Sequence, residues 1–236
     1  MLQAQVWWDL ASPSKTNPNG LKFSFSKIDE ANAPIGHVVR YRIYVPGVPE
    51  SEKYSLGVWK IGTKVTDLQI IAPEVYVNSK GLLMTRRPRP DEEDKNAVAS
   101  DSEIEAGLHS ARGEPIRFIL SNPKKTLLFT GTLVPHAVES KDGNCRLEAR
   151  LGSEEGEAML VYLEGASANS DIPFTSTSEG EVHADTLHTD ANGHAVTVDL
   201  PYVTGKDAGT LKESISMKGC TVSVEIPWGK ESYHPL

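Results

Sequence analysis

One stretch near the C-terminal end of the chain concentrates residue types that bind metal ions. His183, Asp185, His188 and His194 lie close together in sequence, and imidazole and carboxylate groups are common metal ligands. If residues 181–188 form a strand, however, His183 and Asp185 share one face and His188 points to the other. His188 and His194 could meet across a hairpin, which gives two ligands at best. The pattern favours a polar hairpin at a sheet edge, and we expect no metal and no other cofactor.

The chain shows no sequence motif that is typical of an enzyme. It contains no G-x-S-x-G motif, and neither cysteine has a histidine close to it in sequence. Its 32 aspartates and glutamates supply many carboxylates, but spacing alone cannot show which of them form a pair for acid–base chemistry. We therefore expect a protein that is not an enzyme. A metal-dependent enzyme centred on His183, His188 and His194 is the third and last of the functional hypotheses.

The chain has two cysteines, Cys145 and Cys220, and each begins a run of alternating apolar and polar residues. Two thiols in matching contexts, with no further cysteine and no histidine at zinc spacing, favour one disulfide between them. Two reduced, buried thiols are the alternative. A disulfide implies an oxidising compartment, so the predicted location is secreted, cell-surface or periplasmic.

The tryptophans are the best sequence indication of a binding surface. An indole ring offers an apolar face and one polar N–H group, which suits both sugar stacking and protein contacts. Trp7, Trp8 and Trp59 are the candidates. Side chains of Trp7 and Trp8 point in opposite directions if the segment is extended, so a single sheet face can bury only one of them. The alternative for Trp59, and for Trp228, is a place in a core or at a domain junction.

Composition and charge exclude several classes of partner. The chain is 39% hydrophobic and 24% charged, as expected of a folded globular protein. Its formal net charge of -8 and its isoelectric point near 5.4 argue against nucleic acid, because binding of phosphates depends on clustered lysine and arginine. No segment approaches the roughly 20 apolar residues that cross a bilayer. We expect neither a nucleic-acid partner nor a membrane span.

Short runs of alternating apolar and polar residues dominate the chain, which is typical of half-buried antiparallel strands. In residues 38–45, the side chains of Val39, Tyr41 and Ile43 fall on one face, and that of Arg40 falls on the other. Helical periodicity is nearly absent. The sequence therefore predicts an all-β protein.

The strand-like runs divide into two groups separated by a change in composition. Residues 21–87 can fill one sandwich, and residues 114–236 hold roughly the seven or eight strands of a second one. Residues 88–113 are proline-rich and then acidic, so we expect a linker or excursion there, with a short helix within 92–109 left open. Residues 1–20 are expected to form an N-terminal extension. The predicted fold is two tandem immunoglobulin-like β-sandwich domains.

The C-terminal half carries two features that are specific enough to compare with a family. Thr189–Leu200 places a T-D-x-x-G turn before an alternating strand, and Ala208-Gly209-Thr210 places a Gly-Thr step before the next strand. This pattern resembles the latter half of bacterial Ig-like domains of the invasin and surface-adhesin type. The cysteine pair is not a hallmark of that family. The wider C-terminal half is also similar to uncharacterised exported bacterial proteins, a similarity that implies no activity.

The resemblance implies an extracellular module used for spacing, adhesion or assembly, and it assigns no catalytic residue. The leading hypothesis is thus a non-catalytic extracellular or periplasmic module that binds another protein or a surface component. The second hypothesis is a carbohydrate-binding accessory module that stacks a polysaccharide on exposed tryptophans. Fold alone does not decide between them, because sandwiches host many unrelated functions.

Overall fold

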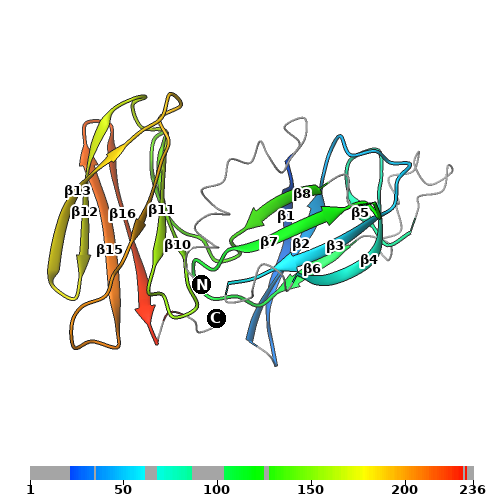
Figure 1. Cartoon of the computed structure of the whole chain (residues 1–236), viewed down its shortest axis with the longest axis horizontal. Helices are drawn as coiled ribbons and strands as arrows, with labels where there is room; N and C mark the ends of the chain where they lie inside the picture. Colours follow the sequence, from blue (N-terminus) through cyan, green and yellow to red (C-terminus); the bar gives the residue numbers. More distant parts are fainter. Residues whose placement is uncertain are drawn as a thin grey trace. The chain divides into compact units, whose positions relative to one another are not determined.

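The structure is a computed structural model that describes residues 22–34, 36–61, 68–86, 104–124, 128–230 and 232. Within these residues every regular element is a β-strand, sixteen in all, and none is a helix. The all-β fold predicted from the alternating residues is therefore confirmed. In the same part of the chain, no helix has the length and apolar character needed to cross a membrane. The strands form two compact units, each made of two sheets (Figure 1).

The first unit comprises described residues up to His109 together with Ile116–Leu133. One of its sheets has three strands, in the order β1 (Ser24–Ala33), β2 (Gly36–Tyr44), β6 (Glu105–Leu108). The other sheet has five, in the order β5 (Leu83–Met84), β4 (Gln69–Val77), β3 (Tyr54–Trp59), β7 (Ile116–Ser121), β8 (Leu128–Leu133). All neighbouring strands are antiparallel.

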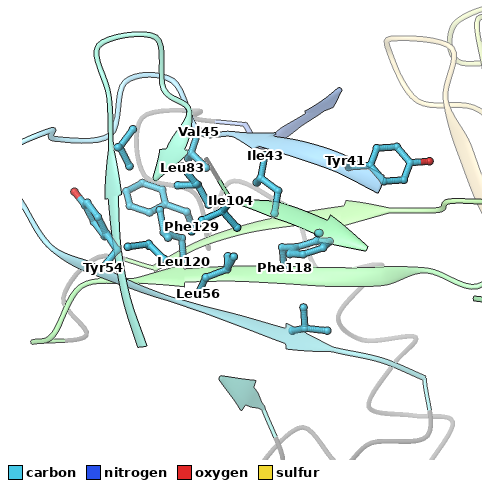
Figure 2. Close-up of a cluster of buried hydrophobic side chains, with 14 of the residues drawn as sticks. Tyr41, Ile43, Val45, Tyr54, Leu56, Leu83, Ile104, Phe118, Leu120 and Phe129 are labelled. Carbon is cyan, nitrogen blue, oxygen red and sulfur yellow. The ribbon is translucent and has the colours of Figure 1, made fainter. Parts of the chain in front are cut away.

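The core of the first unit lies between these two sheets (Figure 2). Ile43 of β2 and Leu56 of β3 are fully buried, and Phe118 of β7 packs in the same cluster. Between the buried positions of β2, Arg40 is exposed and pairs with Asp29 of β1. Full burial of one such apolar side chain contributes about 1.5–3 kcal/mol. The alternation in the sequence therefore corresponds to an inner and an outer face, as predicted for a sandwich.

The second unit comprises Ser110–Pro115 and described residues from Val134 onward. One sheet has the order β14 (Ala195–Asp199), β11 (Met159–Glu164), β10 (Cys145–Leu151), β9 (Val138–Asp142). The other has the order β13 (Glu181–His188), β12 (Asp171–Ser178), β15 (Ala208–Met217), β16 (Cys220–Gly229). Inward-facing residues of both sheets, such as Leu147 and Leu211, are fully buried. These two four-stranded sheets form the second sandwich.

The division between the units differs from the predicted domain boundary at residue 114. Strands β7 and β8 lie beyond that boundary, yet β7 pairs with β3 and β8 pairs with β7 in the first unit. Their apolar residues complete the core of the first unit, which explains why these two strands belong to it. Within the predicted excursion, Glu105–Leu108 is the strand β6, which pairs with β2, and not part of a helix. Residues 1–20 and 87–103 lie outside the described residues.

Candidate functional site

The two edges of the second sandwich differ. On one side, strands β13 and β14 are the last strands of their sheets, and we call this the open side. On the other side, β16 and β9 are the last strands, and we call this the closed side. The chemistry of the two sides decides which of them is available to a partner.

The closed side is joined by side chains and by a covalent bond. Asp142 of β9 accepts a hydrogen bond from the backbone N–H of Thr221 at 2.8 Å, and Ser140 accepts one from the N–H of Ser223 at 3.3 Å. The Cys145–Cys220 disulfide connects β10 to β16. The disulfide expected from the sequence is therefore present. Backbone donors of β16 that would otherwise be free are used inside the unit.

The open side presents an edge strand with little cover. All residues of β13 from Glu181 to Thr186 are exposed, and Leu187 is the one buried residue of the strand. Val182 of β13 is 64% exposed, and Val196 of β14 is 40% exposed. Both apolar side chains keep a large exposed part, so they are available for contact with another molecule.

Near the open side, one row of the inner face of the sandwich is polar. His183, Ser176 and Glu213 are Cα partners on β13, β12 and β15, so they form one row across the sheet. Glu213 is fully buried in this row. It faces Asp199, which comes from β14 of the opposite sheet and contacts it. An ionisable residue thus occupies a place where the neighbouring rows carry Leu211 and Ile215.

Glu213 is a protonated carboxylic acid at neutral pH. Burial, together with the adjacent carboxyl group of Asp199, raises the pKa of Glu213 from its ordinary 4.5 to about 10. Neither carboxyl oxygen of Glu213 receives a hydrogen bond from another described group. Asp199 is the neighbouring carboxyl group, and its interaction with Glu213 favours the protonated form of Glu213. The pair links β15 of one sheet to β14 of the other.

The histidines predicted as weak metal candidates do not form a centre. His183 lies on the inner face of β13, while His188 lies on the outer face, where its Nδ1 is 2.9 Å from Oδ1 of Asp171. His194 lies after β13, and its backbone N–H donates to Asp190. Among residues that the structure describes, no three histidine, cysteine, aspartate or glutamate side chains are arranged to bind a metal ion.

The tryptophans give a mixed result. The prediction that Trp59 is a binding residue needs correction. Trp59 is the last residue of β3, its side chain packs inside the first unit, and only 8% of it is exposed. A ring in that position cannot stack on a sugar. Trp228 is also buried, and its ring centroid lies 6.4 Å from that of the exposed Tyr202. Trp7 and Trp8 lie outside the described residues.

A network of charged side chains covers the outer face of β9, β10 and β11. Arg146 donates to Glu139 at 2.7 Å and to Glu164 at 2.9 Å, and it also pairs with Glu148. Arg150 donates to Glu148 at 2.7 Å. The side chain of Glu148 is only 2% exposed. Sequence analysis did not find this network, although Arg146, Glu148 and Arg150 alternate along one strand and so had to share a face.

Removing the charge of Glu148 is expected to destabilise the second unit. In Glu148→Gln, two partly buried arginines lose their shared carboxylate, and we expect a loss of about 1–2 kcal/mol in the free energy of unfolding. Glu164→Gln is the matched control in the same network: its side chain is 48% exposed, so the loss should stay below about 1 kcal/mol. Denaturant titration measures both. Equal losses would show that burial of Glu148 is unimportant.

Comparisons with known proteins place the chain in no family. No family of known sequences matches it, and no curated protein matches it. Among solved structures, it is similar to red sea bream transglutaminase, with 12% identity and a TM-score of 0.24, over 83% of this chain and 29% of that one. It is also similar to a BSP domain of a biofilm-associated protein, with 10% identity and a TM-score of 0.20, over 94% of this chain and 54% of that one.

Proposed function

We propose that the chain is a non-catalytic interaction module of an exported protein, which acts in adhesion or assembly through contacts with other proteins. The observation that carries this proposal is the contrast between the two sides of the second sandwich. The closed side uses two backbone N–H donors of β16 internally, whereas the open side exposes an eight-residue edge strand and apolar residues. Exposed strand edges bind extended protein segments by extending the sheet.

Two further features support this proposal over its alternatives. The Cys145–Cys220 disulfide suits an oxidising compartment, and therefore a protein that functions outside the cytoplasm. Burial of Trp59 removes one of the rings on which a carbohydrate-binding function depends. Glu213 is fully buried, so its acid group has no access to a substrate.

Microspheres coated with the chain test the proposal. We expect them to be retained on surfaces coated with protein, including the chain itself, and to wash off cellulose and chitin. The double variant Val182→Lys/Val196→Lys should reduce retention at least tenfold, because lysines on edge strands oppose pairing and remove the exposed apolar groups. Thr221→Lys places the same side chain on the closed side and should leave retention unchanged.

Two results would overturn the proposal. Retention on polysaccharide alone would favour the carbohydrate-binding hypothesis. Equal loss in the Thr221→Lys control and the double variant would show that the open side is not the binding surface.

A further inference from the structure

One edge of β13 is not paired with another described strand, and the pairing of β13 with β12 shows which backbone groups lie on that edge. The backbone N–H of Thr189 donates to Ser170, one step beyond the strand, and the register of β12 and β13 is continuous with this bond. Residues of β13 with odd numbers therefore bond to β12. The even-numbered residues Val182, Ala184 and Thr186 direct their N–H and C=O groups away from the sheet.

The edge of β13 lacks several of the features that prevent pairing with another strand. Strand β13 contains no proline, glycine or lysine, and its eight pairs with β12 continue without a bulge. One outward donor is covered locally, since the N–H of Thr186 donates to its neighbour Asp185 at 2.7 Å. A regular, exposed strand of this kind is open to extension by an antiparallel strand.

The sequence of β13 is complementary to itself in a register that keeps most of the strand paired. Two copies can pair antiparallel about a two-fold axis. Because only even-numbered residues direct their N–H and C=O groups outward, an even-numbered residue of one copy must lie opposite an even-numbered residue of the other. An axis at Asp185 sets two aspartates opposite each other, and an axis at His183 sets Asp185 against Glu181. Like charges directly opposite destabilise a pair of strands.

An axis at Ala184 avoids both conflicts. It places the two small Ala184 side chains together and sets Val182 opposite Thr186. It also sets His183 of each copy opposite Asp185 of the other, at a Cβ separation of about 4.5–5.5 Å, which lets the imidazole donate to the carboxylate. Both residues are exposed in the single chain. This register therefore gives two complementary pairs per dimer and no like-charge contact between these side chains.

We propose that two copies of this chain associate by antiparallel pairing of their β13 strands about Ala184. The two four-stranded sheets then join into one sheet across the axis. This inference deepens the proposed function, on which it rests, because it names a second copy of the chain as the protein that the open side binds.

Exchange of the complementary residues tests the proposal. Sedimentation equilibrium of the whole chain should show a reversible dimer. His183→Asp sets aspartates opposite each other and Asp185→His sets histidines opposite each other, so each single variant should raise the dissociation constant at least tenfold. The double variant His183→Asp/Asp185→His restores opposite partners and should return the constant to within about threefold of the parent value. Circular dichroism checks that each variant is folded.

Two further variants serve as a control and as a second test of the pairing. Ser216→Asp adds a negative charge to an exposed position of β15, away from the edge, and should leave the dimer intact. Ala184→Pro removes an outward N–H group without removing a bond to β12, and it should abolish the dimer.

A chain that stays monomeric up to about 1 mM overturns the inference. So does a dimer that persists in Ala184→Pro, or a double variant that is no tighter than the single ones. If the monomer still binds other proteins in the microsphere assay, the proposed function stands without this inference. If no protein is bound, both fail.

Discussion

Replacing Glu213 with glutamine is expected to stabilise the second unit at neutral pH by an amount on the order of 3 kcal/mol. In the unfolded chain the carboxyl group of Glu213 ionises with an ordinary pKa of 4.5, whereas in the fold its pKa is about 10. Between these two values the folded state must hold a proton that the unfolded state releases. Glutamine has nearly the same shape and carries no proton to hold, and its amide can donate to Asp199.

The sign of the pH dependence follows from the same shift. Because the folded state binds more protons than the unfolded state above pH 4.5, the contribution of Glu213 to stability falls as pH rises from about 4.5 toward 10. The parent should therefore lose stability with increasing pH, and Glu213→Gln should show a flatter profile. Denaturant titrations at several pH values between about 5 and about 9 measure both profiles.

Glu225→Gln is the control for this prediction. Glu225 lies on the neighbouring strand β16, its side chain is 62% exposed, and it pairs with Lys212 at the surface. Its replacement should change the free energy of unfolding by less than about 0.5 kcal/mol and leave the pH profile unchanged. If Glu213→Gln is less stable than the parent at neutral pH, then Glu213 is not held in its protonated form.

The sequence predicts the strands well because their signal is local. The run 38–45 has apolar residues at every second position, and strand β2 covers Gly36–Tyr44. Each alternating segment needs only one buried face, and the residue types themselves specify which face that is. Local patterning does not specify which strands pair. Strand β7 joins β3, which lies far back in the chain, and nothing in Ile116–Ser121 itself indicates that partner.

The acid pair could be foreseen only in part. Leu211, Glu213 and Ile215 alternate, so the period of a strand already places Glu213 on the buried face of β15. Its partner could not be foreseen, because Asp199 belongs to the opposite sheet and the contact depends on how the two sheets are stacked. The self-complementarity of β13, in contrast, lies in the local sequence, since it depends on the order of His183, Ala184 and Asp185. It could be recognised only once the structure showed that β13 is an edge strand.

Removal of the disulfide is expected to have the largest effect on stability of any change considered. The bond joins residues that are 75 positions apart, and closing a loop of that length lowers the entropy of the unfolded chain enough to contribute about 4 kcal/mol. Cys145→Ala/Cys220→Ala should lower the free energy of unfolding of the second unit by about that amount. Alanine is the suitable replacement because both cysteines are buried, and a serine hydroxyl there would need a hydrogen-bond partner.

Reduction of the parent protein gives an independent measurement of the same quantity. A thiol reductant should shift the unfolding midpoint of the parent and leave that of Cys145→Ala/Cys220→Ala unchanged. A parent whose midpoint does not respond would show that the bond contributes nothing. The size of the loss also bears on location, because domains of this kind are stable by only about 5–15 kcal/mol in total. A second unit that depends on the bond for about 4 kcal/mol would be marginal in a reducing cytoplasm and secure outside it, where an open sheet edge can meet its partner.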